Sequence, residues 1–302
     1  MKLRVEVPAS TSNLGPGFDA LGMALSLTNK VRCETGGDGL LVEIRGEGAD
    51  VLPHDETNLV IKAMDAVFEE CGQMRPPMRI KIDNGIPTSG GLGGSATALV
   101  AGAMLANELL GTRLGRREEL LDFVARLEGH PDNVAPCLLG GFVASSMDGS
   151  IVQTVQFDPP EHLSAVICAP DLRSDTAQLR AALPTSVPFV DAVHNVGRTA
   201  LLVAAMAKGR LDLLSRAMQD RIHEHVRAAQ VPGYETVRAN AMRAGALACI
   251  LSGAGATMIA FCDDRRGREE AVGEAMCAGF DSAGVSARAI RVMPRTTGAS
   301  MG

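Results

Sequence analysis

The sequence predicts an α+β protein with two domains, and three observations support this fold class. The chain has 302 residues, enough for two domains of about 150 residues each. Stretches with strand periodicity and with helix periodicity alternate irregularly, which disfavours a doubly wound sheet. A Pro-Pro pair at positions 159 and 160 follows a predicted hairpin. We therefore expect one domain over residues 1–158 and a second over residues 159–302.

The elements at the start of the chain follow from local patterns. Alternating apolar residues over 3–7 predict a strand, which runs into the polar, Gly/Pro-rich loop "PASTSNLGPGFD". Asp19 is the one charged residue between Pro8 and Asn29, which is unusual for a loop that is merely solvated. A helix is predicted over Thr57–Cys71, with Asp55 or Thr57 as its cap, and the stretch "MRIKI" then predicts a strand.

The remaining elements are read in the same way. The Gly-rich loop "GGLGGS" opens an Ala/Leu-rich helix that we expect to stop at Gly111, and a second helix ends in "LEGHPDN". The stretch "FVASSMDGSIVQTVQF" predicts a hairpin, and "LSAVICAP" predicts a strand. Three helical stretches follow up to about Arg227. "ACILSGAGATMIAFC" predicts strand, tight turn and strand, and a helix and the strand "ARAIRVM" come next. We expect the tail "TTGASMG" to be mobile.

Composition excludes several functional classes. A net charge of -6 argues against a nucleic-acid or anionic-membrane surface, since such surfaces bind through clustered Lys and Arg. Seven cysteines without a Cys-x-x-Cys pair, and a start without an apolar export segment, predict a reduced, cytoplasmic protein. Two uncharged stretches, 86–107 and 244–262, have the length of a membrane span, but a Gly-rich turn interrupts each of them. We therefore expect no membrane partner.

The Gly-rich loop before the second predicted helix favours a phosphate ligand. Such a loop presents free backbone N–H groups and the positive end of the helix dipole, although a close-packed turn is the alternative. It is not a P-loop, because no Gly-Lys-Ser/Thr follows. Gly91-x-Gly93-x-x-Ala96 matches the dinucleotide fingerprint, but eight residues separate it from Ile82 and a second helix follows. A nucleoside triphosphate is therefore favoured over NAD.

A second polar cluster lies in "LEGHPDN", which places Glu128, His130, Asp132 and Asn133 in one turn. Polar groups between apolar helices are costly to bury without partners. The carboxylates could hold Mg²⁺, which prefers one or two carboxylates plus phosphate oxygens. The alternative is a helix end followed by a Pro-Asp turn. Zinc is disfavoured, because no second His or Cys stands at ligand spacing from His130.

Cationic and backbone candidates follow in the second half. Thr176 and Arg180 are four residues apart and share a helix face, and Arg227 stands at the end of another helix. Each arginine could equally be a solvated charge or a partner of a helix end. The turn "SGAGAT" is read either as a bare hairpin turn or as a second backbone cradle.

Four motifs, "PASTSNLGPGFDALG", "GIPTSGGLGGSATA", "LEGHPDNVAPCLLGG" and "LSGAGATMIAF", occur in the order and spacing of the GHMP kinases. The chain resembles this family over essentially its whole length, and most closely the branch that phosphorylates the amino acid L-homoserine on the route to threonine. The resemblance implies a two-domain GHMP kinase fold with a ferredoxin-like C-terminal domain. It also implies ATP and Mg²⁺, a small-molecule substrate, and leaves a homodimer open.

The resemblance implies a role for individual residues. ATP is expected at the phosphate loop and its surroundings: Asn58, Pro87, Gly90, Gly91, Leu92, Gly93, Gly94, Ser95 and Ala96. Mg²⁺ is expected on Ser95 and Glu128. The amino-acid site is expected to be lined by Asn13, Asp19, His130, Asp132, Thr176, Arg180 and Arg227. Asp19 and Asn133 are the expected catalytic residues. Some family members have Asp at position 133, so a dedicated general base is doubtful here, and the proton leaves late, through Asp19 or to the phosphate.

The chemistry of the expected substrate agrees with these residues, because a zwitterion needs a carboxylate such as Asp132 for its ammonium and forked arginines for its carboxylate. Two rivals stand beside this interpretation. The protein could phosphorylate another small alcohol such as mevalonate or threonine. It could also be a nucleotide-binding sensor without catalysis, which Gly90 and Gly94 favour because the family has Arg and Ser there. The retained Ser95 and Glu128 favour an enzyme.

Overall fold

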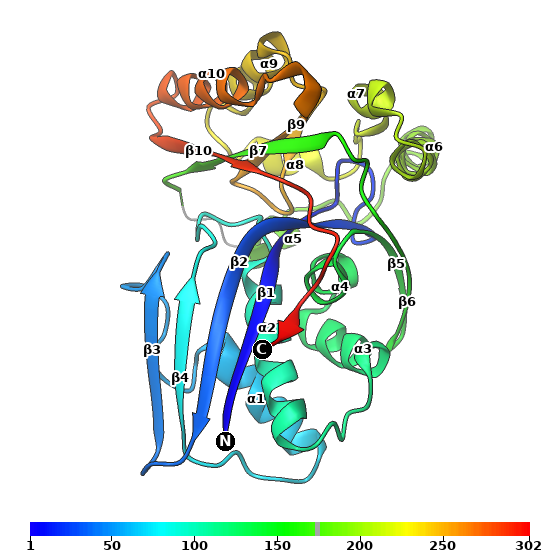
Figure 1. The fold of residues 1–302 in the computed structure, drawn as a ribbon. Coiled ribbons are helices and arrows are strands. Elements are labelled where there is room, and N and C mark those ends of the chain that lie inside the picture. The colour runs from blue at the N-terminus through cyan, green and yellow to red at the C-terminus, as the bar shows by residue number, and fades with distance from the viewer. Residues whose placement is uncertain (173–175) are drawn as a thin grey trace.

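The computed structural model describes residues 1–172 and 176–302, and the chain forms two halves, each built on its own sheet (Figure 1). The first half has a seven-stranded sheet in the order β11-β1-β2-β4-β3, and the β5–β6 hairpin continues it from β2. Its strands are β1 (Lys2–Ser12), β2 (Leu21–Thr35), β3 (Leu40–Gly46), β4 (Met78–Asn84), β5 (Phe142–Asp148), β6 (Ile151–Phe157) and β11 (Ser300–Met301). Pairing is antiparallel except between β3 and β4.

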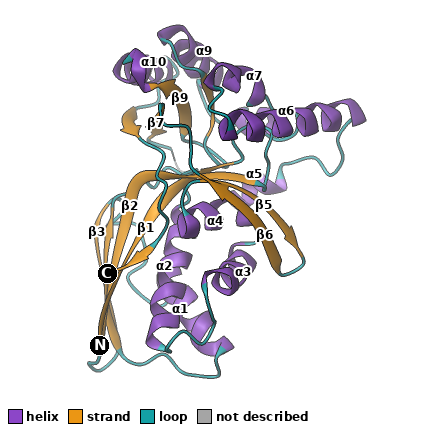
Figure 2. Cartoon of the chain, turned by 45° about the vertical axis from the view of Figure 1, so that its right-hand side comes forward, coloured by secondary structure: helices purple, strands orange, loops and turns teal. Residues whose placement is uncertain are grey.

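Four helices fill the space between this sheet and the β5–β6 hairpin (Figures 1 and 2). They are α1 (Leu59–Glu70), α2 (Gly94–Leu109), α3 (Arg117–Glu128) and α4 (Pro131–Leu139). Alternate residues of the strands, such as Val5 and Val31, are buried against helix residues such as Met64. A Cβ on Gly102 of α2 would lie 2.2 Å from the carbonyl oxygen of Val60, so this glycine lets α1 and α2 approach closely.

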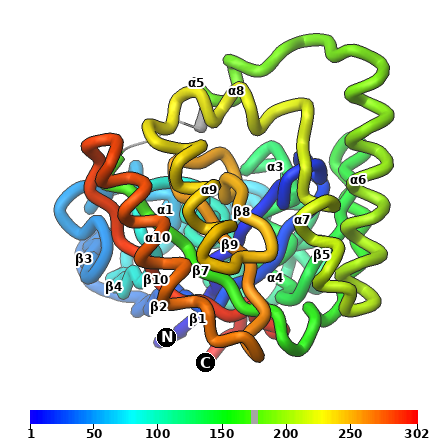
Figure 3. The backbone as a smooth tube through the Cα atoms, turned by 90° about the horizontal axis from the view of Figure 1, so that it is seen from above, coloured from blue at the N-terminus to red at the C-terminus, as the bar shows by residue number. Residues whose placement is uncertain are grey.

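The second half has a four-stranded antiparallel sheet in the order β10-β7-β9-β8. Its strands are β7 (Leu163–Pro170), β8 (Ala248–Leu251), β9 (Met258–Asp263) and β10 (Ala287–Val292). This strand order is that of a ferredoxin-like fold, as predicted. The helices are α5 (Thr176–Ala181), α6 (Phe189–Ala207), α7 (Leu214–Ala217), α8 (Glu224–Ala228), α9 (Tyr234–Ala244) and α10 (Glu269–Asp281), with short 3-10 turns at 211–213 and 264–266. Helices α9 and α10 cover the outer face of the sheet (Figures 1 and 3).

A core cluster between the sheets joins the two halves. Leu25 and Phe142 come from the first half, whereas Ile167 and Phe261 come from the second, and all four belong to one buried cluster. Burying a side chain of this size contributes about 1.5 to 3 kcal/mol. The halves therefore pack as one body, and a boundary near residues 158 and 159 remains a proposal.

Several sequence predictions are wrong in detail. Helix α1 is capped neither by Asp55 nor by Thr57, because the side chain of Asn58 accepts the N–H of Val60. Helix α4 was not predicted as a helix: its Pro131 stands at the first helical position, where a missing N–H costs nothing. One strand was predicted between the first loop and α1, where the structure has two, β2 and β3. The tail is ordered rather than mobile, since β11 pairs with β1.

Among the helices that the structure describes, none combines the length and the apolar character that a membrane crossing requires.

Candidate active site

A cavity of about 360 Å³ lies where connecting segments of the two halves meet. They include the segments that follow β1, β3, β4, α3 and β8, so residues far apart in the sequence share one space. The cavity brings together nearly all of the predicted site residues: Asn13, Asp19, Asn58, Pro87, Gly90, Gly91, Leu92, Gly93, Gly94, Ser95, Glu128, His130, Asp132, Asn133, Arg180 and Arg227. Ala96 is fully buried and does not line it. Thr176 begins α5, and its side chain lies outside the described part of the chain.

The phosphate loop has the shape that a bound anion requires. Gly90, Gly91 and Gly93 all have positive φ, and Gly93 is the N-cap of α2 without any side-chain cap, so the first N–H groups of the helix are left for a ligand. A Cβ on Gly91 would lie 2.1 Å from the carbonyl oxygen of Ser252, so the loop also fits tightly against the turn between β8 and β9. A Cβ on Gly94, in contrast, would meet no atom within 4 Å.

Two oxygen-bearing side chains that could hold a divalent cation stand beside this loop. The hydroxyl of Ser95 donates a hydrogen bond of 2.5 Å to Oε1 of Glu128, which joins the start of α2 to the end of α3. Burial raises the pKa of Glu128, and the hydrogen bond from Ser95 partly opposes this effect. A neighbouring cation would stabilise the ionised carboxylate. A hydroxyl and one carboxylate next to a phosphate loop fit Mg²⁺, which takes its remaining ligands from phosphate and water.

Asn58 lines the cavity, but its side-chain amide is occupied by the backbone. Its oxygen caps α1, and its nitrogen donates to the carbonyl of Pro53 at 2.7 Å. Asn58 therefore fixes the wall of the cavity between Pro53 and Val60. Whether an adenine ring rests against this wall stays a prediction.

The loop after β1 is held in place from the other half of the protein. Asn13 has a φ of 64° and donates through its amide to the carbonyl of Gly253 at 2.9 Å, and its oxygen accepts the N–H of Asp19 at 3.1 Å. The carboxylate of Asp19 forms a two-pronged ion pair with Arg180, at 2.9 and 2.7 Å. Asp19 and Arg180 thus satisfy each other, and both border the cavity.

The turn before α4 carries a buried carboxylate. Asp132 is only 1% exposed, and its Oδ1 lies 2.5 Å from Nδ1 of His130 and 3.4 Å from the amide nitrogen of Asn133. Both of these contacts within the described residues fall on Oδ1, so Oδ2 remains for a ligand. Burial disfavours the charged His130 ring, but the hydrogen bond and the charge of Asp132 outweigh it and raise the pKa of His130. One polar side-chain atom from each of Asp19, His130 and Asp132 lies within 4.8 Å of the other two.

Asn133 is fixed by hydroxyl groups of β1. Ser10 donates to its oxygen and its amide nitrogen donates to the hydroxyl of Ser12, both at 2.8 Å. Because both ends of the amide are engaged and an amide does not titrate near neutral pH, Asn133 can orient neighbours but cannot remove a proton.

Arg227 is the buried cation of the cavity. It is 2% exposed and lies over the ring of Phe18, with its carbon Cζ 5.2 Å from the ring centroid. Its Nε is buried without a partner, and no carboxylate within the described ranges forms an ion pair with it. Burial and the nearby charge of Arg180 lower the pKa of Arg227. A buried charge is costly unless it is paired, so this group calls for an anion from outside the chain.

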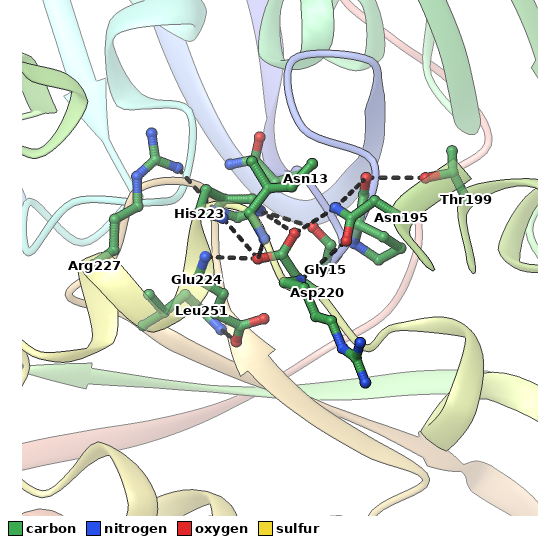
Figure 4. A network of polar contacts seen from close by, with 12 residues as sticks. Asn13, Gly15, Asn195, Thr199, Asp220, His223, Glu224, Arg227 and Leu251 are labelled. Carbon is green, nitrogen blue, oxygen red and sulfur yellow. Dashed lines mark hydrogen bonds and ion pairs between the residues drawn. The ribbon is translucent and has the colours of Figure 1, made fainter. Parts of the chain in front are cut away.

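A network that sequence analysis missed supports Arg227 and the loop after β1 (Figure 4). His223 donates from Nε2 to the carbonyl of Gly15 at 2.7 Å, which leaves Nδ1 to accept from Arg227 at 3.4 Å. Burial lowers the pKa of His223, so the ring is neutral as this pattern requires. Asp220 accepts the backbone N–H groups of Ile222, His223 and Glu224 and the amide of Asn195. An Asp and a His three residues apart are common on solvated segments, so their spacing in the sequence is only a weak indication of this buried network.

The chain matches two family models, and together they cover more than half of it. The GHMP kinases N terminal domain matches residues 58–141, and the GHMP kinases C terminal domain matches residues 202–282. Among curated proteins, the homoserine kinase of Moorella thermoacetica is 44% identical over 295 residues, or 98% of both chains. The homoserine kinase of Deinococcus radiodurans is 45% identical over 261 residues, which are 86% of this chain and 84% of that one.

The comparison with solved structures also finds a homoserine kinase. The crystal structure of homoserine kinase from Cytophaga hutchinsonii is 30% identical, with a TM-score of 0.88 over 100% of this chain and 97% of that one. The mevalonate kinase of L. major, solved with R-mevalonate, has a TM-score of 0.69 at 18% identity over 96% and 95% of the chains, and this likeness extends to the fold alone.

Proposed function

Because this chain belongs to the GHMP kinase family, and within it to the homoserine kinases, we propose that it transfers the terminal phosphoryl group of ATP to the side-chain hydroxyl of L-homoserine. The product is O-phospho-L-homoserine, an intermediate on the route to threonine. The proposal extends to a domain boundary near residues 158 and 159, a cytoplasmic location, and partners limited to small molecules rather than nucleic acid or membrane.

The observation that carries this proposal is that one cavity is lined both by the buried guanidinium of Arg227, which has no ion-pair partner among the described residues, and by the buried carboxylate of Asp132. An amino acid supplies the complement of both, because its carboxylate pairs with the arginine and its ammonium with the aspartate. Mevalonate and galactose have no ammonium, so Asp132 would remain without a cationic ligand. Asp19 and Arg180 neutralise each other, and we propose that Arg180 holds the Asp19 carboxylate at the edge of the cavity and so positions the loop after β1.

Positioning and charge neutralisation supply most of the catalysis in this proposal. Free N–H groups at the start of α2 bind the phosphate oxygens, and Ser95 and Glu128 hold Mg²⁺, which when bound neutralises phosphate charge. Asp132 and Arg227 fix the two charged groups of the amino acid, so its hydroxyl is held at the loop. Asn133 does not act as a base. The hydroxyl proton leaves late in the reaction, to Asp19 or to the transferred phosphoryl group.

The test is the identity of the product. The purified chain is incubated with ATP, Mg²⁺ and one acceptor, and ADP release and ³¹P NMR are followed for L-homoserine, mevalonate and galactose. We expect a new phosphomonoester on the side-chain oxygen of homoserine and negligible ADP with the other two. ATP binding without ADP release on any acceptor would instead support the nucleotide-sensor alternative.

A further inference from the structure

Phe18 lies in the loop after β1, next to Asp19, and its side chain is half-buried. Two other apolar residues of this part of the chain, Leu14 and Leu21, are buried in the core cluster between the sheets. Phe18, in contrast, belongs to none of the core clusters that the described residues form. Its ring is therefore not an anchor of the loop in the core, and its contacts lie elsewhere.

The ring of Phe18 packs against three nitrogen-bearing side chains of the second half. The guanidinium carbon Cζ of Arg180 lies over the ring, 5.4 Å from its centroid, and Cζ of Arg227 lies over the same ring at 5.2 Å. The imidazole ring of His223 is tilted by 37° against it, with the two centroids 5.0 Å apart. The face of an aromatic ring carries negative potential, so one ring attracts both cations.

Arg180 has a strong second partner, whereas Arg227 has only weak ones. Asp19 binds Arg180 through both carboxylate oxygens, so consecutive residues of the loop hold this guanidinium by charge and by a ring face. The hydrogen bonds of Arg227 within the described ranges are long, at 3.4 Å to Nδ1 of His223 and 3.5 Å to a backbone carbonyl (Figure 4). Hydrogen bonds of this length are weak. The ring of Phe18 is therefore a main contact that orients Arg227.

A ring face suits this guanidinium better than a carboxylate of the chain would. The nearby charge of Arg180 repels that of Arg227, and it lowers the pKa of Arg227 together with the larger effect of burial. An ion pair within the chain would offset this repulsion, but it would also occupy the N–H groups that a substrate carboxylate needs. An aromatic face attracts the delocalised charge as a whole, so it stabilises the cation and leaves those N–H groups for a ligand.

We propose that Phe18 is a positioning residue of the amino-acid site, whose ring face holds the guanidinium of Arg227 in the orientation that receives the substrate carboxylate. The same face supports Arg180 in its pair with Asp19. This inference rests on the proposed function. Phe18 is not among the residues that line the cavity, so it acts through the arginines rather than by touching the substrate. The negative face of the ring, and not only its apolar volume, then determines how strongly the carboxylate is bound.

The test replaces Phe18 in the full chain by monofluorinated and trifluorinated phenylalanine and by leucine. Fluorination keeps the shape of the ring but weakens its negative face stepwise, and leucine removes the ring. kcat/KM is measured with L-homoserine and with 3-aminopropan-1-ol, which lacks the carboxylate. We expect kcat/KM for homoserine to fall stepwise, to about 10- to 30-fold below the wild type in Phe18→Leu, while the value for 3-aminopropan-1-ol changes less than ~3-fold.

Trifluorinated phenylalanine in place of Phe123 is the matched control. Phe123 also has a guanidinium over its ring, with Cζ of Arg126 5.4 Å from the centroid, but it does not line the cavity. Fluorination there should leave the kinetics at wild-type values.

Thermal unfolding of the free chain gives a second readout that needs no substrate. Fluorine makes a ring more apolar, so burial alone would maintain or raise the Tm of the trifluorinated Phe18 variant. Loss of the contacts with the two cations should instead lower it by about 2 °C.

A graded loss on homoserine alone, together with the lower Tm, supports the proposal. Equal losses on both substrates, or kinetics and Tm that do not follow fluorination, overturn it. A wild type that does not phosphorylate L-homoserine overturns the proposed function instead. In that case the dependence of Tm on fluorination still decides whether the ring supports the arginines.

Discussion

Replacing Arg227 by Met should remove recognition of the substrate carboxylate while leaving the fold intact. The guanidinium is 2% exposed and has no ion-pair partner among the residues described, so its charge lowers the stability of the free protein. Met keeps the length and the apolar contact with Phe18 but removes the charge. We expect the variant to be at least as stable as the wild type in thermal unfolding, which separates a loss of function from a loss of structure.

The size of the kinetic effect follows from the burial of the pair. Removing one partner of a buried ion pair costs about 3 to 5 kcal/mol, because the other charge is left unpaired. Arg180 stands close enough to lower the pKa of Arg227, so in the variant it can still neutralise part of the charge of a bound carboxylate. We therefore use the lower end of this energy range. A loss of about 3 kcal/mol corresponds to a fall in kcat/KM for L-homoserine of about 150-fold.

The assay compares two substrates on two proteins. ADP formation is measured with L-homoserine and with 3-aminopropan-1-ol, which is homoserine without its carboxylate. If Arg227 binds the carboxylate, the wild type prefers homoserine strongly and Arg227→Met loses most of this preference. The four kcat/KM values form a double-mutant cycle, which isolates the interaction between the guanidinium and the substrate carboxylate. Arg221→Met, on an exposed arginine that pairs with Asp191 at 3.4 Å, is the control and should retain wild-type kinetics. An equal loss on both substrates would refute the carboxylate role of Arg227.

Three further predictions concern the nucleotide, the metal and pH. Gly94→Ser should lower KM for ATP about tenfold, because its Cβ meets no atom within 4 Å and its hydroxyl adds one charge-assisted hydrogen bond to phosphate; an unchanged KM would mean that this position does not face ATP. Glu128→Ala should raise the Mg²⁺ concentration for half-maximal rate and lower kcat, and wild-type Mg²⁺ dependence would reduce its contact with Ser95 to a structural bond. Burial raises the pKa of Glu224 from 4.5 to about 7, so the stability that its neutral form contributes is complete below pH 4.5 and is lost as pH rises through 7. Glu224→Gln keeps an acceptor for Tyr234, so its free energy of unfolding should exceed that of the wild type by about 3 kcal/mol at pH 8 and match it near pH 4.5. Urea unfolding measures these values, and the same difference between variant and wild type at both pH values would contradict the prediction.

Local patterns were enough to predict much of the fold and the Gly-rich loop at the start of α2. The hairpins and the Gly-rich loop depend on turn chemistry and periodicity within a few residues, so each could be identified from its own segment. The ferredoxin-like order of the second sheet came from the family resemblance. The cap of α1 failed for a local reason, because Asp55, Thr57 and Asn58 are all good capping residues and only the backbone geometry selects Asn58.

The amino-acid half of the site depends on contacts between distant segments, which no local pattern contains. Asp19 and Arg180 are 161 residues apart, and within the described part of the chain Arg227 forms no ion pair. Nothing in the sequence indicated that Arg180 pairs with a carboxylate of the chain itself, and the shared role of the two arginines in substrate binding stays a prediction. The tautomer of His223 is likewise set by the carbonyl of Gly15, which is 208 residues away. The order of the tail depends on β1 at the other end of the chain.

The central claim is that the cavity holds both α-substituents of an amino acid while its hydroxyl receives phosphate. The most direct test is kcat/KM of the wild type for Mg²⁺-dependent ADP formation with L-homoserine against 4-hydroxybutyrate, which lacks only the ammonium. Asp132 offers that ammonium a buried carboxylate, and a charge-assisted hydrogen bond contributes roughly 1.5 to 3 kcal/mol. We predict a preference for L-homoserine of at least ~10-fold and up to ~150-fold. Equal turnover of the two substrates would contradict the amino-acid site.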